Sequence, residues 1–461
     1  MVYHSSDRKG VLNDTTDTIA AIATPPGHGG VGIVRISGQF CQQIAEKTIG
    51  RVPQPRYAFF CCFYNHNKEI LDQGIALYFP KPHSFTGEDI LELHGHGGPI
   101  VMDGLLRYIL QLGARLARPG EFSERAFLNG KIDLSQAEAI ADLIHSTSEQ
   151  AARSALQSLQ GEFSARINTL RDQLIELRCL AEASIDFSDQ DINFIERGSV
   201  AERLEIVQST LKAIYHSAEQ GALLQEGIRV MLIGRPNVGK SSLYNQLVGS
   251  KAAIVTDIPG TTRDLLREHI IIDGLPIYLS DTAGLHNSMD VVEQEGMRRT
   301  REGLANCDHV LLVADDQTGL TEAEHIILDE LPHGVTYTVI FNKIDINNAP
   351  IERKQESWGV VLRVSALTGA GMNLIQQRLK ECAGFDTGER VGCFSARRRH
   401  LEALNRARSA IAIARETLQV GVEEVLAEEL RLAQNALSEI TGKYYSDDLL
   451  GEIFSTFCIG K

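Results

Sequence analysis

The stretch 234–241 constrains the fold of this chain more than any other, because it matches the pattern G-x-x-x-x-G-K-S. Gly234 and Gly239 permit backbone conformations that turn successive N–H groups toward phosphate oxygens. An apolar run at 228–233 precedes the pattern and predicts a buried strand, and 242–248 predicts the following helix. A strand, a glycine-rich loop and a helix in this order predict a nucleoside-triphosphate site in an α/β domain.

Two side chains of this loop are expected to act on the bound triphosphate. Lys240 places a positive charge at the β and γ phosphates, and the hydroxyl group of Ser241 is suited to bind Mg2+. We expect the loop to contact the nucleotide through a short run of residues. They are Asn237, Val238, Gly239, Lys240, Ser241 and Ser242.

Three further motifs indicate that the nucleotide is GTP, because each follows an apolar run and their order is typical of GTP-binding domains. Asp281 is expected in the Mg2+ shell, and Gly284 can present an N–H to the γ-phosphate. Asp345 can accept two hydrogen bonds from a guanine edge, which adenine cannot supply. A Ser-Ala-Leu loop is expected to cover guanine O6 with a backbone N–H. The residues of these motifs are Asp281, Thr282, Ala283, Gly284, Asn342, Lys343, Asp345, Ser365, Ala366 and Leu367.

The hydrolytic residues differ from the Ras pattern, because Leu285 occupies the position of the glutamine that orients the attacking water there. Another group must therefore orient the water and offset the charge of the transition state. The stretch 253–264 is the expected first switch, in which Thr262 would bind Mg2+. The switch residues expected at the nucleotide are Thr256, Asp257, Ile258, Pro259, Gly260, Thr261 and Thr262.

A monovalent cation at the β–γ bridge of GTP could supply the positive charge that an arginine finger supplies in other GTPases. Asn237 is neutral, carries an oxygen and lies on the loop that faces this position. Carbonyl oxygens of Thr256 and Ile258 could complete a shell suited to a hard cation. The alternative is that Asn237 only braces the loop.

The composition restricts the class of protein. The chain has 461 residues and a formal net charge of −15, which argues against nonspecific nucleic-acid binding over the whole surface. Eight cysteines in a chain of this length do not indicate a secreted disulfide framework. No apolar run approaches the roughly 18 residues of a membrane span, and the N-terminus lacks a signal-peptide pattern. We expect a cytoplasmic protein.

The chain divides into four predicted segments, 1–130, 131–221, 222–384 and 385–461. The first segment contains short β-rich runs and a helix at 100–112, which predict an α+β domain. The third segment alternates strands and helices as in a doubly wound fold. The second and fourth are helical, and the fourth ends in an apolar tail that is expected to dock. The strands expected in the first segment are 18–23, 32–37, 56–64, 74–79 and 89–94.

Apolar residues at three-and-four spacing form one helical stripe at 156–181 and another at 426–440, the second stopped by Gly442. Ser135 and Glu138 match a capping box at a helix start. Because each stripe must be buried, we predict one helical bundle into which the GTP-binding domain is inserted.

Three other patterns have simpler interpretations. The match to G-x-G-x-x-G at 27–32 precedes a strand-like run instead of a helix, so a dinucleotide site is not expected. His94 and His96 lack further ligands at metal spacing, which favours a role in a turn. The basic run 397–400 is typical of an exposed helix start, with RNA contact as the alternative.

Four stretches of the chain resemble the MnmE family (also called TrmE), the GTPases that modify the wobble uridine of tRNA. They are 23–35, 84–89, 118–129 and 457–461, so the resemblance spans essentially the whole chain. It implies a multidomain protein with an α+β N-terminal folate-binding domain, a discontinuous α-helical bundle domain and an inserted α/β P-loop G domain of the Ras-like type.

The resemblance implies a folate site. The family binds 5-formyltetrahydrofolate, which stands in for a one-carbon donor such as 5,10-methylenetetrahydrofolate. By motif, Arg35, Glu92 and Lys131 would contact it, helped by Lys461. The role of Cys458 stays open between catalysis and simple burial near the folate.

The resemblance also implies how GTP is hydrolysed, because the G domains of this family pair in a K+-dependent way. The water-orienting role falls on Glu293, which side-chain chemistry alone does not separate from Glu295. Pro259 departs from the small residue expected there, although 260–262 is intact. The implied K+ contacts are Asn237, Thr256, Ile258 and Thr261.

The implied function is that of a homodimer working with a FAD-containing partner of the MnmG (GidA) family, as a heterotetramer or larger complex. Together they would add an aminomethyl or carboxymethylaminomethyl group to C5 of uridine 34 in certain tRNAs, with a one-carbon unit from folate. The chain shows no flavin motif, so the redox chemistry is expected on the partner. The nitrogen donor, ammonium or glycine, stays open. The alternative is an Era-type ribosome-assembly GTPase without chemistry on a base.

Overall fold

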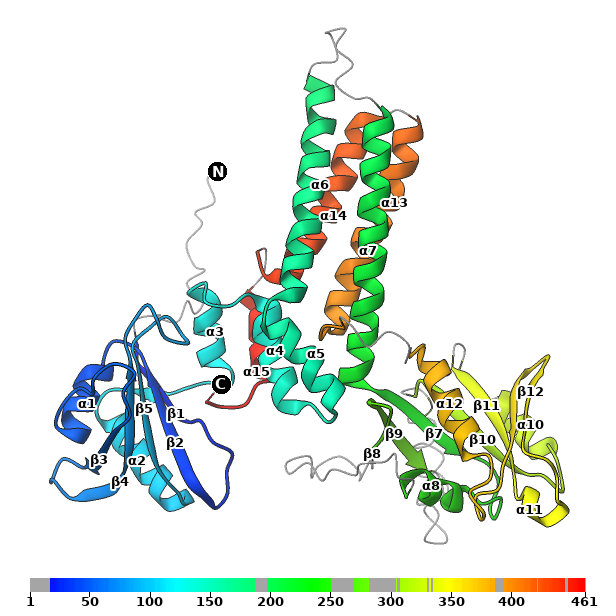
Figure 1. Ribbon diagram of the computed structural model, residues 1–461, viewed down its shortest axis with the longest axis horizontal. Helices are drawn as coiled ribbons and strands as arrows, with labels where there is room; N and C mark the ends of the chain where they lie inside the picture. Colours follow the sequence, from blue (N-terminus) through cyan, green and yellow to red (C-terminus); the bar gives the residue numbers. More distant parts are fainter. Residues whose placement is uncertain are drawn as a thin grey trace, which may run out of the picture. The chain divides into compact units, whose positions relative to one another are not determined.

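The computed structural model in Figure 1 describes residues 17–186, 197–249, 269–281, 304, 307–329, 331–332, 335–385, 393–420, 422–443 and 447–460. Contacts divide the chain into two compact units. The N-terminal unit comprises residues up to Ala141 and those from Thr441 onward, and the insertion unit is Asp142–Ile440. An α+β domain, a helical bundle and a P-loop domain are all present, which confirms the predicted multidomain fold. The borders of the four predicted segments stay predictions.

The N-terminal unit is built on a six-stranded sheet in the order β3-β4-β5-β2-β1-β6, antiparallel except between β1 and β6. Each strand expected from the sequence is present, several with extended bounds. Its elements are β1 (Ile19–Ile22), β2 (Gly29–Ser37), α1 (Cys41–Ile49), β3 (Phe59–Tyr64), β4 (Ile70–Phe79), β5 (Ile90–Gly97), α2 (Pro99–Gln111), β6 (Arg115–Leu116), α3 (Glu121–Leu128), most of α4 (Leu134–His145) and α15 (Asp447–Ser455).

The alternation of side chains along β2 and β5 separates a core face from an open face of this sheet. Val34 pairs with Leu93, and both side chains are fully buried in the core that includes residues of α1 and α2. Arg35, the next residue, pairs with Glu92. Because successive side chains of a strand point to opposite faces, Arg35 and Glu92 lie together on the face away from this core.

A network of ion pairs joins α3 to the strands of this unit. Glu121 is almost fully buried and accepts hydrogen bonds from Arg115, while Arg125 contacts Asp17, Glu88 and Glu121. Burial by itself raises the pKa of Glu121, but the hydrogen bonds from Arg115 and from a backbone N–H lower it to about 2. The buried carboxylate therefore stays ionised and paired at neutral pH.

The C-terminal tail docks inside the N-terminal unit, as its apolar sequence predicted. Leu450, Phe454 and Phe457 share a buried cluster with residues of α4. Gly120, at the start of α3, has a φ of +67°, and a Cβ atom there would lie 2.7 Å from the carbonyl oxygen of Phe454. Only glycine therefore suits this close approach of the tail. A β-bridge of Ile459 continues the contact.

The insertion unit contains a helical bundle and a GTP-binding domain. Among the residues that the structure describes, no helix is both long and apolar enough to cross a membrane. The helices of the bundle part are α5 (Glu149–Leu159), α6 (Glu162–Asp186), α7 (Arg197–Glu226), α13 (Arg398–Val420) and α14 (Glu423–Thr441).

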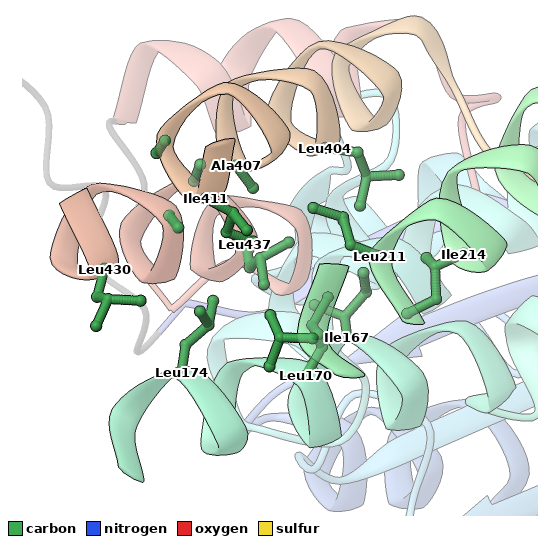
Figure 2. Packing of buried hydrophobic residues seen from close by; sticks show 14 of the residues in the cluster. Ile167, Leu170, Leu174, Leu211, Ile214, Leu404, Ala407, Ile411, Leu430 and Leu437 are labelled. Atoms are coloured by element: carbon green, nitrogen blue, oxygen red, sulfur yellow. The ribbon is translucent and has the colours of Figure 1, made fainter. Parts of the chain in front are cut away.

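Four of these helices, α6, α7, α13 and α14, share one apolar core, which Figure 2 shows from close by. Leu170, Leu211 and Leu404 are fully buried in it, and Leu430 and Leu437 face them from α14. Helices on both sides of the GTP-binding domain in sequence therefore bury their apolar stripes against each other. This confirms the predicted bundle.

Two local predictions for these helices were wrong. Leu156 does not continue the apolar stripe and is 44% exposed, because Gly161, with a φ of +88°, separates α5 from α6. The capping box at the start of α4 is not formed by Ser135 and Glu138. Asp133 accepts a hydrogen bond from the N–H of Gln136, and the side chain of Gln136 accepts one from the N–H of Asp133.

The GTP-binding domain has a seven-stranded sheet in the order β12-β13-β11-β10-β7-β9-β8. The five strands from β13 to β9 in this order are parallel, and the outer two, β12 and β8, are antiparallel to their neighbours. Its elements are β7 (Ile228–Ile233), α8 (Lys240–Val248), β8 (His269–Ile272), β9 (Leu275–Asp281), β10 (His309–Asp315), α10 (Glu322–Asp329), β11 (Thr336–Asn342), α11 (Ile344–Asn347), β12 (Glu352–Glu356), β13 (Gly359–Arg363) and α12 (Met372–Ala383).

We expect Leu170→Ala to lower the free energy of unfolding of the bundle by about 2–5 kcal/mol, because truncation of a fully buried leucine leaves a cavity. Urea unfolding followed by helical circular dichroism measures this change. Leu432→Ala, at a 43% exposed position of α14, is the matched control and should cost less than about 0.5 kcal/mol. Equal effects of the two substitutions would contradict the described core.

Candidate active site

The candidate nucleotide site lies where the parallel strands end. β7, β9, β10 and β11 run in the same direction, and Leu232 pairs with Asp281 while Asp315 pairs with Asn342. The loop after β7, the end of β9 and the loops after β10 and β11 therefore lie at one edge of the sheet. Ligands of open α/β sheets bind at this carboxyl edge.

The glycines of the phosphate loop lie against the ends of neighbouring strands. Gly234 has a φ of +146°, and a Cβ atom there would lie 2.2 Å from the carbonyl oxygen of Val313. Gly239 has a φ of +98°, and a Cβ atom would lie 2.3 Å from the side-chain nitrogen of Asn342. Both positions require glycine. Between them Asn237 has a φ of +64° and is exposed.

Lys240 opens α8 with its charge directed into the loop. Its Nζ atom donates to the carbonyl oxygens of Gly234 and Arg235, both at 2.8 Å. The following residues Ser241 and Ser242 are exposed at the start of the helix. A buried ammonium group and a helix N-terminus beside one loop form a surface suited to phosphate.

Asn342 connects the phosphate loop to the loop expected at the base. Its Nδ2 atom donates to the carbonyl oxygen of Val238 at 2.9 Å, and its Oδ1 atom accepts from the N–H of Ala366 at 2.9 Å. The side chain is almost fully buried. One amide thus fixes two loops that lie far apart in sequence.

The remaining residues of the base-reading motifs converge on the same place. The hydroxyl of Ser365 donates to Oδ1 of Asp345, which orients the carboxylate. Lys343 donates to Asp315 at 2.8 Å, and this hydrogen bond lowers the pKa of the Asp315 carboxyl group. Leu367 is 82% exposed, where it can cover a bound base. These contacts bring Asn342, Lys343, Asp345, Ser365 and Ala366 together.

Many predicted site residues lie outside the described residues, and Asp281 is described only by its backbone at the end of β9. Of the residues predicted to bind Mg2+ and K+, the structure therefore describes Ser241, Asn237 and this strand end. The residues outside the description are Thr256, Asp257, Ile258, Pro259, Gly260, Thr261, Thr262, Thr282, Ala283, Gly284, Glu293 and Lys461.

A second group of charged residues lies on the open face of the N-terminal sheet. Glu92 accepts from Nε of Arg35 at 2.8 Å and from Nε2 of His94 at 3.2 Å. Burial raises the pKa of Glu92, but the hydrogen bond from His94 and the charge of Arg35 outweigh it and lower the pKa. The Arg35 guanidinium lies 6.0 Å and 5.8 Å from the ring centres of Phe85 and Phe122.

The C-terminal tail reaches this second group. Arg35 donates to the carbonyl oxygen of Gly460 at 3.3 Å, and the N–H of Gly120 donates to the carbonyl oxygen of Cys458. The side chain of Cys458 is exposed. Lys131 is exposed as well and donates to the carbonyl oxygen of Pro82. Both charge signs and aromatic rings beside Arg35 suit a ligand with a flat, polar ring and carboxylates.

The prediction that His94 and His96 lie in a turn was wrong, because both lie in β5. His94 lies in β5 and contacts Glu92, whereas His96 hydrogen-bonds Asp72. The signal that could have placed it is the two-residue spacing from Glu92, which puts both side chains on one face of a strand. Within the described residues, no cluster of three or more His, Cys, Asp or Glu side chains could hold a metal ion.

The other noted patterns have structural roles. The run 27–32 leads into β2, which begins at Gly29, and no helix follows, as predicted. In the basic run before and within α13, Arg397 pairs with Asp142 at 2.7 Å. Arg399 donates to the carbonyl oxygens of Glu439 and Ile440 at the end of α14. These two arginines are therefore engaged within the insertion unit.

Two families match this chain. One described as "GTP-binding protein TrmE N-terminus" matches residues 18–131, and one described as "MnmE helical domain" matches residues 134–458. The tRNA modification GTPase MnmE of Nitrosococcus oceani is 73% identical, over 100% of both chains. Proteins of the same name from Methylococcus capsulatus and Vibrio cholerae are 55% and 54% identical, over 96% and 97% of this chain and 99% and 100% of theirs.

Among solved structures, Era of Aquifex aeolicus bound to GDP and aluminium fluoride is similar to part of this chain. The identity is 25% over 40% of this chain and 66% of that chain, with a TM-score of 0.27. The relatives that match along the full length do not favour an Era-type GTPase.

We expect Asn342→Ala to weaken GDP binding by at least about tenfold, because it leaves the buried Val238 carbonyl and Ala366 N–H without partners, at about 1–3 kcal/mol each. Titration with a fluorescent GDP analogue measures the dissociation constant. Asn347→Ala, which removes an exposed hydrogen bond to Asp316, is the control and should leave affinity within about twofold. Unchanged binding by the Asn342 variant would contradict the bridging role.

Proposed function

The chain belongs to the MnmE family of tRNA modification GTPases, and we propose that it drives a modification at C5 of wobble uridine 34 in certain tRNAs. It is an enzyme that hydrolyses GTP to GDP and phosphate, and tRNA is the substrate of the modification. The observation that carries the proposal is the match along the full length to tRNA modification GTPases, and the hydrogen bonds of Asn342 to Val238 and Ala366 support a nucleotide site.

The GTP step uses residues at the carboxyl edge of the sheet. Lys240 offsets charge on the β and γ phosphates, and Ser241 and Thr262 would hold Mg2+, with Asp281 in its outer shell. Mg2+, when bound, neutralises charge on the phosphate oxygens. Asp345 and Lys343 select guanine, with the carboxylate oriented by Ser365. The glycines at 234 and 239 let backbone N–H groups approach the phosphates closely.

We infer that a monovalent cation, K+, completes the charge compensation. Asn237 supports this inference because its side chain is exposed on the loop, in a left-handed conformation between the two anchored glycines. An amide oxygen is a hard ligand of the kind that K+ accepts. Thr256, Ile258 and Thr261 would complete the shell, and Glu293 would orient the attacking water, with Glu295 as the alternative.

The second charged group is proposed as the folate site. Arg35 and Glu92 would bind 5,10-methylenetetrahydrofolate, or its analogue 5-formyltetrahydrofolate, with Lys131 and Lys461 as further contacts. The carboxylate of Glu92 can accept N–H groups of a pterin edge, while Arg35 can pair with a carboxylate. Cys458, exposed on the tail near this group, is the proposed reactive side chain.

The proposed assembly is a homodimer with a FAD-dependent partner of the MnmG type, in a heterotetramer or larger complex. Exposed apolar side chains on two neighbouring strands of the N-terminal sheet support a dimer contact there. Phe60 on β3 is 68% exposed and pairs with Ile75 on β4, which is 38% exposed. A tRNA substrate implies a cytoplasmic location.

Deletion of the gene is expected to remove the C5 substituent from wobble uridine in a subset of tRNAs. Mass spectrometry of tRNA nucleosides measures this loss. Complementation with the wild-type chain should restore the substituent, and complementation with Asn342→Ala should restore less of it because GTP binding is weakened. Wobble uridines that are unaltered in the deletion strain would refute the proposed modification.

GTP turnover is expected to be at least about tenfold faster in KCl than in NaCl at equal ionic strength, because the proposed cation stabilises charge on the departing phosphate. Phosphate release measures turnover. Asn237→Gly removes the side-chain oxygen but tolerates the φ of +64°, so it should abolish the difference while GDP binding persists. Equal wild-type rates in the two salts would exclude the ion from the mechanism.

A further inference from the structure

The phosphate loop is attached to the rest of the domain at both of its ends. Gly234 lies against the carbonyl of Val313, and Val238 is held by the amide of Asn342. A further attachment comes from Arg235, which directly follows Gly234. Arg235 donates from Nε to Glu324 at 2.5 Å and from Nη2 to Thr318 at 3.1 Å.

Glu324 is a fixed anchor for this arginine. Its side chain is fully buried at the first turn of α10, where it accepts hydrogen bonds from the N–H and the hydroxyl of Thr321. Burial raises the pKa of Glu324, but the hydrogen bonds from Thr321 and Arg235 outweigh it and lower the pKa. A buried carboxylate of this kind needs its cationic partner, because an unpaired charge inside the protein is costly.

Thr318 extends the attachment toward the base-reading loop. Its hydroxyl donates to the carbonyl oxygen of Asp315 at 3.4 Å, and the carboxylate of Asp315 accepts from Lys343 at 2.8 Å. Arg235 therefore connects the first part of the phosphate loop to the segment after β10, which contacts Lys343.

Asn237 lies two residues after Arg235 and has a φ of +64°. Asparagine adopts the left-handed region more readily than most non-glycine residues, and the surrounding loop selects that conformation here. The position of its side-chain oxygen depends on this conformation. The residues that hold the loop on either side therefore decide where the oxygen lies.

We propose that Arg235 is a positioning residue for the monovalent cation: its ion pair with Glu324 restrains the stretch of the phosphate loop that carries Asn237, whose side-chain oxygen would bind the ion. This inference rests on the proposed role of K+. Loss of the ion pair would loosen the stretch between Gly234 and Val238. The ends would stay attached through Gly234 and Asn342, so the effect should fall on cation affinity more than on nucleotide affinity.

The test compares the KCl dependence of GTP hydrolysis in the wild-type chain and in the double variant Arg235→Met with Glu324→Gln. The double variant avoids leaving the Glu324 charge buried and unpaired. We expect the half-maximal KCl concentration to rise about threefold to tenfold, while the dissociation constant for GDP changes by less than about threefold. Arg235→Lys retains a cation for Glu324. Its half-maximal KCl concentration should lie between those of the wild-type chain and the double variant.

A second double variant, Arg353→Met with Glu381→Gln, is the matched control. It removes an ion pair of 2.6 Å in the same domain that contacts neither the phosphate loop nor Glu324. Its KCl dependence should equal that of the wild-type chain.

A half-maximal KCl concentration within about twofold of wild type in the Arg235 variants would overturn the proposal. An equal loss of GDP affinity and K+ affinity would also overturn the proposal, because it would indicate that the whole loop is disrupted. A wild-type chain without any KCl response would instead refute the proposed cation itself.

Discussion

The buried amide of Asn342 is the interaction on which the nucleotide site depends. It spans from the carbonyl of Val238 to the N–H of Ala366, so the loop for phosphate and the loop for the base are held at one spacing. The parallel sheet brings these loops to the same edge, but strand pairing alone does not fix how far apart they lie. The buried hydrogen bonds of Asn342 fix this distance, because breaking them leaves polar groups unpaired away from water.

Charge organises both candidate sites, although the chain as a whole is acidic. In the nucleotide site, Lys240 lies within the loop, and Arg235 is neutralised by a buried glutamate. On the N-terminal sheet, Glu92 is held between Arg35 and His94. In each case an ionised group is fixed by nearby charged or polar partners, which keeps its direction constant. Fixed charges of this kind favour one ligand chemistry over others more than they add to stability.

Elements that are determined by a local pattern of residues could be predicted from the sequence. The strand 228–233 and the helix after it were predicted correctly because an apolar run and glycines mark them directly. The predictions failed where a neighbouring residue interrupts the local pattern or where a contact depends on residues far apart in sequence. Leu156 keeps helical spacing, yet Gly161 interrupts the helix after it. The partnership of Glu92 with Arg35 depends on pairing between β2 and β5, and register between strands far apart in sequence is not visible in either strand alone.

The docking of the C-terminal tail has a consequence for how the protein is made. Residues from Thr441 onward complete the unit that begins near the N-terminus, and all of Asp142–Ile440 is translated between them. During most of its synthesis, a nascent chain therefore contains Arg35 but not yet Gly460, whose carbonyl oxygen later accepts a hydrogen bond from Arg35. Joining such distant parts costs less chain entropy when the intervening stretch has already folded into a compact body. The ribosome thus has time to release a finished GTP-binding domain before the first unit closes.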